Sequence, residues 1–369
     1  MDIRKELSST LMVSNLLATV MVIAIHYNFY YPKFLFLDSV NWNFLFQEFF
    51  TNGIARVSVP FFAMVSGFFL LSKIKNFSEY IKIIKIKTKS LLIPYLIGST
   101  VVFISWIIYI SLYSTNKPHE LNLYITIRSI IAQPESIQYW FLRDLIILTI
   151  ISPAILNNNR ILNYVLGFCL GVLWFLDIQP FPIVAGWYLI SIETIFFFWL
   201  GGFLYKNIHL INYVIQCSDK VKFSVFITWL CLISIRIAFD HDLNVWYANN
   251  YTIESILLYK FAIFVGVFST IQISEKFRNV QFLIYLSGLT FFAFLYHLVP
   301  LQYFVNYISN TIMDKEYSFY FNFPVATLLV FILAAMTSHL LPSLYSIITG
   351  GRSPDKTMQR ASYSHAKSD

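Results

Sequence analysis

Ten long apolar stretches constrain the fold of this chain more than any other feature. Each approaches the ~20 residues that a helix needs to cross the hydrocarbon core of a bilayer. They centre on residues 11–30, 54–72, 91–112, 140–156, 161–176, 189–205, 223–239, 253–271, 282–299 and 323–341. We therefore predict an all-α fold, a polytopic integral membrane helix bundle of about ten transmembrane helices. The polar tetrapeptide at 157–160 favours a tight hairpin between the fourth and fifth of them.

The composition supports a membrane protein and excludes other classes. Of the 369 residues, 57% are hydrophobic and only 12% are charged, whereas a soluble globular chain carries about 25% charged residues. That deficit excludes a soluble enzyme, a disordered protein and a nucleic-acid-binding domain. The net charge of +7 then reflects membrane topology, and no nucleic acid partner is expected. The three cysteines are too few and too scattered for a disulfide framework, and none has metal-ligand spacing.

The distribution of lysine and arginine orients the bundle. With the N-terminus inside, the cytoplasmic segments hold 18 of the 26 Lys and Arg residues, and the opposite loops hold four. This bias places both termini in the cytoplasm. The first apolar run is too long for a signal peptide and is expected to remain as a span. Residues 1–349 then form the transmembrane domain, and the polar residues 350–369 form a cytoplasmic tail that we expect to be disordered.

A lysine-rich segment before the third apolar stretch has two interpretations. Lys82, Lys85 and Lys89 share one helical face, and isoleucines occupy much of the rest. The segment can be an interfacial helix that fixes topology on anionic membrane lipid headgroups. It can also be an electrostatic landing site for an anionic cytosolic donor such as an acyl-coenzyme A. The first interpretation is favoured, because such lysines are ordinary positive-inside signals.

Ionisable side chains inside the apolar stretches are candidates for function, because a charge at the bilayer centre costs at least ~2.5–3.5 kcal/mol. In the orientation above, seven of them fall in the extracytoplasmic half. They are His26, Arg56, Arg143, Asp144, Glu193, Glu254 and His297. Their common depth predicts a shared polar cavity, although each residue could instead snorkel to the interface or pair structurally. Arg236 and Lys260 also lie in apolar stretches, and the sequence identifies no partner for either.

Histidine and arginine in one membrane cavity suit acyl transfer to an alcohol. Imidazole titrates near neutrality and can take a proton from a hydroxyl as that hydroxyl attacks an acyl carbonyl. Arginine keeps its charge when buried and can hold a phosphate or stabilise a developing oxyanion. A proton-coupled transporter could use the same residues nearly as well, so the residue types leave both functions open.

Three sequence strings distinguish these functions. The string RVSVPFFAMVSGF at residues 56–68 resembles the R-x-x-x-P-x-F-F-x-x-S-G-aromatic signature of membrane acyltransferase family 3, which includes surface-polysaccharide O-acetyltransferases. WFLRDL at 140–145, followed by Ser152-Pro153, looks like the W-[FY]-L…P segment of that family. Tyr296-His297 is similar to its late aromatic–histidine element. The order and spacing of these elements match across nearly the whole chain.

The resemblance implies an integral membrane O-acetyltransferase of the bacterial inner (cell) membrane. Its donor would be acetyl-coenzyme A, used as a substrate with no bound cofactor. Its acceptor would be a hydroxyl of a cell-envelope polysaccharide, such as lipopolysaccharide, or of a lipid-linked precursor. The family usually carries an arginine eleven residues before the histidine of the first span. Here that histidine is His26 and the arginine position holds Asn15, about 16.5 Å along the helix toward the cytoplasm.

These matches assign expected roles to residues. His26 is expected to be the general base, and His297 to assist it. Arg56 and Arg143 are expected to orient phosphates of the donor or acceptor, or to stabilise the oxyanion. The other residues expected to contact substrate are Asp144, Trp140, Ser66 and Glu193.

Structural roles and competing functions remain open beside this assignment. Ser66 and Gly67 can let two helices approach closely, and Trp140 starts a span, where aromatic belt residues are common. A transporter or flippase of a lipid-linked glycan would use the cavity for passage instead of chemistry. A glycan polymerase ranks last, because it would carry a large extracytoplasmic loop and the outer loops here have ordinary lengths.

Overall fold

The computed structural model describes residues 3–30, 41–74, 77–113, 123–132, 134–156, 159–179, 182–184, 187–188, 190–241, 243, 245 and 251–355. Almost all of them are helical. The first half comprises α1 (Ile3–His26), α2 (Trp42–Thr51), the 3-10 turn η2 (Ile54–Val57), α3 (Ser58–Leu71), α4 (Phe77–Tyr113), α5 (Leu123–Ile127), the π-helical turn η3 (Arg128–Ala132), α6 (Tyr139–Ile155) and α7 (Arg160–Phe175). A two-stranded antiparallel hairpin follows, formed by β1 (Pro182–Val184) and β2 (Trp187–Tyr188). The second half comprises α8 (Ile192–Lys206), α9 (Ile208–Gln216), α10 (Asp219–Phe239), α11 (Ile253–Lys276), α12 (Gln281–Ser287), α13 (Thr290–Tyr296), α14 (Leu301–Ile312), the 3-10 turn η4 (Lys315–Tyr317), α15 (Ser318–Leu340) and α16 (Pro342–Ile348).

Within the described residues, six helical segments are long and apolar enough to cross a membrane, and the count is up to eight if each of two bent pairs is one span. The six are α1, α2 with α3, α4, α10, α11 and α15. The bent pairs are α8 with α9, at 91°, and α13 with α14, at 68°. The remaining predicted spans correspond to α6 and α7, which have 17 and 16 residues and are shorter than each of the six segments. Every predicted stretch thus contains a helix, although the expected count of ten exceeds the six to eight segments that pass by length and composition.

Three helical segments differ from the prediction. α2 lies outside every predicted stretch because the buried polar residues Gln47 and Glu48 interrupt its apolar pattern. The lysine-rich segment and the third apolar stretch form one continuous helix, α4, of 37 residues with Pro94 inside it. The predicted span 282–299 is instead two short helices, α12 and α13, which break after Gly288. Glycine favours such a break because it weakens a helix.

The centre of the bundle is a close contact between α3 and α8. A Cβ atom on Gly67 would lie 2.0 Å from the carbonyl oxygen of Phe198, and one on Gly201 would lie 1.8 Å from the carbonyl oxygen of Met64. Only glycine lets the two backbones come this close. Gly67 therefore makes the close helix contact expected at Ser66-Gly67, and the contact fixes α3 and α8 relative to each other.

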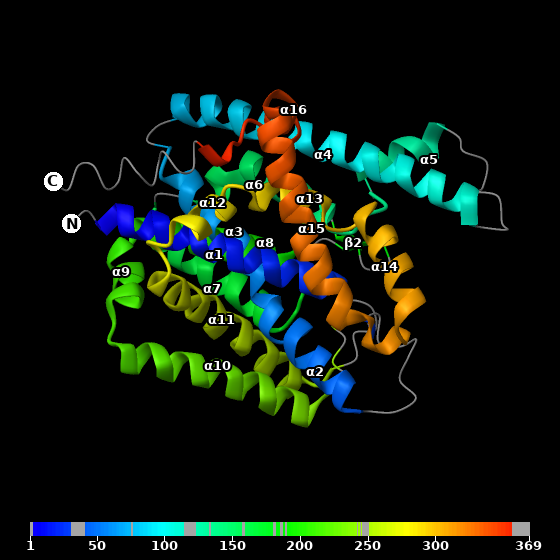
Figure 1. The fold of residues 1–369 in the computed structure, drawn as a ribbon. Helices are drawn as coiled ribbons and strands as arrows, with labels where there is room; N and C mark the ends of the chain where they lie inside the picture. The colour runs from blue at the N-terminus through cyan, green and yellow to red at the C-terminus, as the bar shows by residue number, and fades with distance from the viewer. Residues whose placement is uncertain are drawn as a thin grey trace.

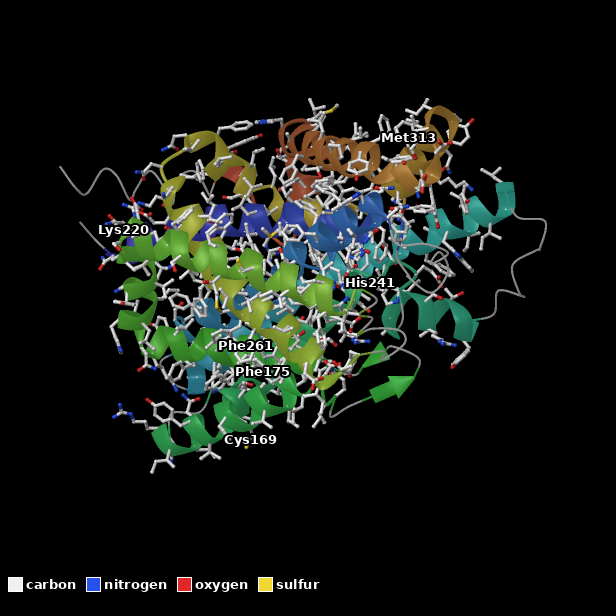
Figure 2. The ribbon with its side chains drawn as sticks, turned by 90° about the horizontal axis from the view of Figure 1, so that it is seen from below. Cys169, Phe175, Lys220, His241, Phe261 and Met313 are labelled. Atoms are coloured by element: carbon white, nitrogen blue, oxygen red, sulfur yellow. The ribbon has the colours of Figure 1, made fainter. Side chains whose placement is uncertain are left out.

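Charged side chains from three segments pair at one end of the bundle. α1 runs through the middle of the bundle, with α4 along one edge and α10 along the other (Figure 1). Figure 2 places Lys220 and His241 at opposite ends of α10. At the Lys220 end, Glu275 of α11 pairs with Lys222 of α10 at 3.0 Å and with Arg278 at 2.7 Å, and Arg278 also pairs with Glu6 of α1. The structure thus gathers three segments predicted to be cytoplasmic at one end.

The periphery of the bundle exposes large apolar side chains. Phe168 on α7 is 74% exposed, Leu112 on α4 is 70% exposed and Phe223 on α10 is 65% exposed. A soluble protein rarely leaves large contiguous apolar surface in water. This surface is typical of helices that face lipid, and it agrees with a multi-pass membrane protein.

The first residues of the predicted tail pack against the bundle. The guanidinium of Arg352 donates to the carbonyl oxygen of Ser90 at 3.2 Å and lies 3.6 Å from the ring centroid of Phe291. The carbonyl of Ser90 lacks its usual helical donor because Pro94 has no N–H. Arg352 therefore satisfies a carbonyl that the proline leaves without its helical bond. The remaining predicted tail, 356–369, lies outside the described residues.

Candidate active site

Two histidines from opposite ends of the chain meet inside the bundle. His26 is the last residue of α1, and His297 caps the C-terminus of α13 at the bend before α14. Their ring centroids are 5.2 Å apart, and the rings are tilted by 39°. The sequence predicted both as site residues, and His297 lies where α13 and α14 bend by 68°.

His297 is held in one orientation by backbone groups. It is fully buried, and its Nδ1 lies 2.9 Å from the carbonyl oxygen of Phe294 and 3.2 Å from that of Ala293. Since both neighbours are acceptors, Nδ1 carries the proton and Nε2 is left as a basic nitrogen. Within the described part of the chain, Nε2 has no hydrogen-bond partner. A buried acceptor without a partner is costly, so it is a natural place for a substrate hydroxyl to donate.

The surroundings of the histidine pair fix its backbone. The hydroxyl of Tyr27 donates to the carbonyl oxygen of His297 at 2.7 Å. The side chain of Gln302, on α14, donates to the carbonyl oxygen of His26 at 3.4 Å. These bonds tie the end of α1 to both arms of the bent pair α13 and α14, so the two imidazoles are positioned by three helices.

Arg56 lies in the 3-10 turn η2, which precedes α3 and packs against α1. Its Nε donates to the side-chain oxygen of Asn52 at 2.9 Å. The guanidinium is close enough for its charge to act on both His26 and Glu193. The structure therefore brings His26 and His297 together, with the charge of Arg56 acting on His26, and the roles of the three residues stay predictions.

A buried ion pair positions Asn52, the residue that accepts a hydrogen bond from Arg56. Arg236 of α10 pairs with Glu48 of α2, and both side chains are 1% exposed. A second nitrogen of Arg236 donates to the backbone carbonyl of Asn52 at 3.1 Å, while the Asn52 amide donates to Glu48 at 2.8 Å. The donor bonds of the Asn52 amide leave its oxygen to accept from Arg56. Sequence reasoning missed Glu48 and Asn52, because Arg236, which bonds to both, lies 188 and 184 residues away in the chain.

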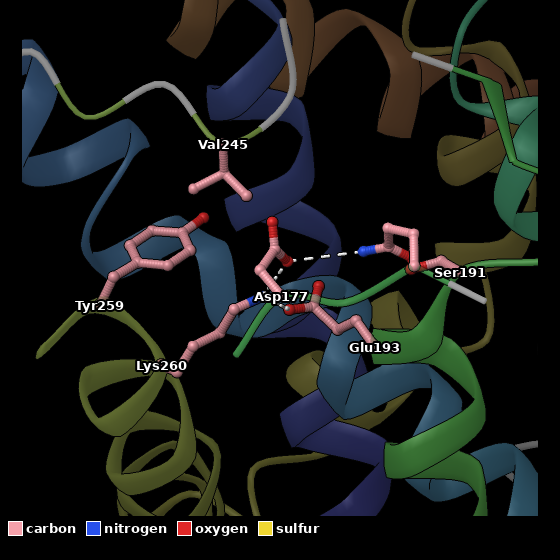
Figure 3. Close-up of a pocket in the computed structure, with 7 residues that line it drawn as sticks. Asp177, Ser191, Glu193, Val245, Tyr259 and Lys260 are labelled. Atoms are coloured by element: carbon pink, nitrogen blue, oxygen red, sulfur yellow. Dashed lines mark hydrogen bonds and ion pairs between the residues drawn. The ribbon is translucent and has the colours of Figure 1, made fainter. Parts of the chain in front are cut away.

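A second ion cluster surrounds a small polar cavity near the same end of the bundle (Figure 3). Lys260 of α11 lies 2.9 Å from Asp177 and 3.9 Å from Glu193. Glu193 also accepts a hydrogen bond from the indole of Trp174 at 3.1 Å. The predicted site residue Glu193 therefore lines this cavity, and Lys260 has the partners that the sequence did not identify. Asp177 was missed because it follows the helix as a single polar residue.

Arg143 and Asp144 lie on α6, and Asp144 contacts the start of α8. Their side chains pair at 3.3 Å, and the fully buried carboxylate of Asp144 accepts from the backbone N–H of Ser191 at 2.9 Å. Ser191 is the residue before α8. In this arrangement Asp144 stabilises the start of α8, where a negative charge suits the helix dipole.

Trp140 and Ser66, the other two residues expected to contact substrate, are each partly buried. Trp140 packs against the main core in the first turn of α6, at 6.0 Å from Phe141 between ring centroids. Ser66 lies one residue before the glycine that contacts α8. Their contacts with substrate stay predictions. Among the described residues, no group of three His, Cys, Asp or Glu side chains could hold a metal ion.

This arrangement can activate a hydroxyl in a buried site. A basic imidazole nitrogen can accept the hydroxyl proton, and an adjacent fixed guanidinium can stabilise negative charge that develops on an acyl oxygen. The bonds that position these groups come from the protein and exist before substrate arrives. Such preorganisation is what an acyl transfer site requires.

Comparison with known proteins agrees with this chemistry. The model of a family described as an acyltransferase domain matches residues 16–340. The succinoglycan biosynthesis protein ExoH of Rhizobium meliloti (strain 1021) is 24% identical over 328 residues, which cover 85% of this chain and 84% of that protein. No solved structure matches. Because the family match spans most of the chain and includes both histidines, the chain belongs to membrane acyltransferase family 3.

Proposed function

We propose that this protein is an integral membrane O-acyltransferase that moves an acyl group, acetyl in the simplest case, from cytosolic acyl-coenzyme A to a hydroxyl of an envelope polysaccharide or its lipid-linked precursor. The observation that carries the proposal is the His26–His297 pair, 5.2 Å apart between ring centroids. Family membership and the likeness to a succinoglycan biosynthesis protein support a polysaccharide acceptor.

The proposed reaction gives each residue a defined task. His26 takes the proton of the acceptor hydroxyl as its oxygen attacks the thioester carbonyl, and Nε2 of His297 accepts a hydrogen bond from the hydroxyl or from His26. Arg56 stabilises the oxyanion that forms on the carbonyl oxygen. When the intermediate collapses, the carbon–sulfur bond breaks, the ester remains on the acceptor, and the proton goes to the coenzyme A thiolate.

The residues that the structure pairs internally have supporting tasks in this scheme. Arg143 and Asp144 hold the start of α8, and Trp140 and Ser66 lie in the helices α6 and α3 that surround the site. Contacts of these four residues with substrate remain part of the proposal, as does acetyl-coenzyme A as a dissociable donor substrate.

Mass spectrometry of envelope glycans tests the function. Glycans from cells with the gene should carry an ester mass increment that is absent without the gene. Membranes that contain the protein should also transfer labelled acetyl groups from acetyl-coenzyme A to glycan. A transporter or flippase would instead change the amount of surface glycan without adding an ester, and that result would overturn the proposal.

The orientation in the bacterial inner membrane is also proposed, with ten spans and both termini in the cytoplasm. The 18-to-4 distribution of lysine and arginine supports it. A reporter fused after Lys89 or at Asp369 should be cytoplasmic, and one fused near Asn116 should be exported. A cytoplasmic reporter at Asn116 would overturn the orientation.

A further inference from the structure

The cavity beside Lys260 contains polar atoms that the proposed acyl transfer does not use. It is lined by Asp177, Gln179, Ser191, Glu193, Val245, Tyr259 and Lys260. Val245 lies between α10 and α11, and the other residues come from the segment after α7, the start of α8 and the first turns of α11. These segments present the residues at the end of the bundle that carries the histidine pair.

Unused hydrogen-bonding capacity marks the cavity as a binding site. Ser191 is 1% exposed, and its hydroxyl has no hydrogen-bond partner in the described part of the chain. Figure 3 shows the Tyr259 hydroxyl directed toward the cavity near Asp177. Buried polar groups are nearly always hydrogen-bonded, so an unpaired hydroxyl that lines a cavity indicates a partner from outside the protein.

The backbone of Asp177 is a second observation at the same place. Its φ of 53° lies in the left-handed region, where glycine is the usual residue after a helix. An aspartate there is tolerated at a cost, so its carboxylate has a use. That carboxylate accepts from Lys260 at 2.9 Å and from Tyr251 at 3.2 Å.

Size and charge restrict what can bind. The volume within which the centre of a water molecule can move in the cavity is ≈ 10 Å³. The cavity therefore holds about one oxygen-sized group. Its walls carry two carboxylates, Asp177 and Glu193, against one ammonium, Lys260. A phosphate is larger than this space, and an acyl chain would meet polar walls. A neutral hydroxyl fits, because it can donate to a carboxylate and accept from Lys260 or Ser191.

Arg56 connects this cavity to the histidine pair. Its charge acts on Glu193 and Tyr259 at the cavity and on His26 at the pair. The turn η2, which carries Arg56, packs against both α1, which ends at His26, and α11, which carries Tyr259 and Lys260. We propose that the cavity formed by Asp177, Ser191, Tyr259 and Lys260 binds one non-reacting hydroxyl of the sugar acceptor, and so selects which hydroxyl reaches the histidines. This inference rests on the proposed glycan acceptor.

Removing hydroxyls that line the cavity tests the inference. The Ser191 hydroxyl has no hydrogen-bond partner among the described residues, so its removal carries little risk to folding. The variants are Ser191→Ala, Tyr259→Phe and the double variant. The matched control is Ser269→Ala on α11, because Ser269 is also 1% exposed and its hydroxyl also lacks a hydrogen-bond partner among the described residues. Ser269 does not line the cavity.

The first measurement is acetyl transfer to deacylated glycan from cells that lack the gene. The KM for glycan should rise about 3–10-fold in Ser191→Ala, the loss expected for one hydrogen bond, while the KM for acetyl-coenzyme A and the kcat stay unchanged. The double variant should show a larger rise, and Ser269→Ala should behave like the wild type. An unchanged KM for glycan in the double variant would overturn the inference.

The second measurement is binding without turnover. The same glycan should raise the melting temperature of the purified wild-type protein and of Ser269→Ala, and the double variant should lose most of that shift. If the wild type transfers no acetyl group but the binding pattern holds, the proposed function fails and the sugar site stands. If transfer occurs and the shift is equal in all variants, the site fails and the function stands.

Discussion

Two buried polar clusters at the same end of the bundle differ in how completely the protein pairs their atoms. The Glu48–Arg236 pair is 1% exposed and is bonded to Asn52 from both sides. The His26–His297 pair has a ring contact, and Nε2 of His297 lacks a hydrogen-bond partner in the described part of the chain. Paired charges hold helices together, whereas the unpaired nitrogen is available to a substrate. The comparison predicts that damage to the first cluster removes the fold, and damage to the second removes only the chemistry.

Breaking the ion pair should have the largest effect. Arg236→Leu leaves the Glu48 carboxylate buried without its cation, which costs about 3–5 kcal/mol. We expect little folded protein in the membrane, measured by size-exclusion chromatography of a fluorescent fusion. The double variant Arg236→Leu with Glu48→Gln removes both charges and should recover part of the loss. Normal accumulation of Arg236→Leu would contradict the structural role of this pair.

Replacing Arg56 should separate chemistry from folding. Arg56→Lys keeps the charge but loses the planar guanidinium, and with it the Nε donor to Asn52. We expect roughly 100-fold slower acetyl transfer, equivalent to about 2.7 kcal/mol, with normal amounts of protein in the membrane. Transfer by Arg56→Lys at the wild-type rate would show that Arg56 belongs with the structural cluster.

The contact between α3 and α8 should respond to a single methyl group. In Gly67→Ala the new Cβ would lie 2.0 Å from a backbone oxygen that cannot move away easily, so we expect a loss of about 1–3 kcal/mol. The control is Gly171→Ala, whose Cβ would meet its nearest atom at 3.6 Å. Thermal unfolding in detergent should show a lower melting temperature for Gly67→Ala and an unchanged melting temperature for the control. Equal melting temperatures would contradict the close contact.

Local patterns predicted the helices, and contacts across the bundle determined the rest. Each apolar stretch contains a helix because burial in lipid requires it, and the unexpected α2 is a helix whose polar residues face buried partners. His26 and His297 were predicted because histidine in an apolar stretch is conspicuous. The partners of Arg236 and Lys260 lie 188 and 83 residues away, so no local pattern could identify them. The break after Gly288 was missed for a different reason, because the apolar pattern of the sequence continues through it.

The far end of α1 should give the smallest effect. If Asn15 occupies the place of an arginine that contacts the donor, Asn15→Arg should preserve or raise the use of acetyl-coenzyme A. The readout is the KM for acetyl-coenzyme A in the membrane transfer assay. Complete loss of transfer with normal expression would show that this protein binds its donor by another arrangement.

The histidine pair is tested most directly by acetyl transfer in membranes that contain His26→Gln or His297→Gln. Glutamine keeps a polar side chain but cannot accept the proton, and a positioned base contributes typically 10²–10⁴-fold. We predict that both variants reach the membrane at wild-type levels and that His26→Gln loses transfer by at least ~10²-fold. Near-wild-type transfer by His26→Gln would remove its role as general base. Near-wild-type transfer by both variants would contradict the claim that this pair carries the reaction.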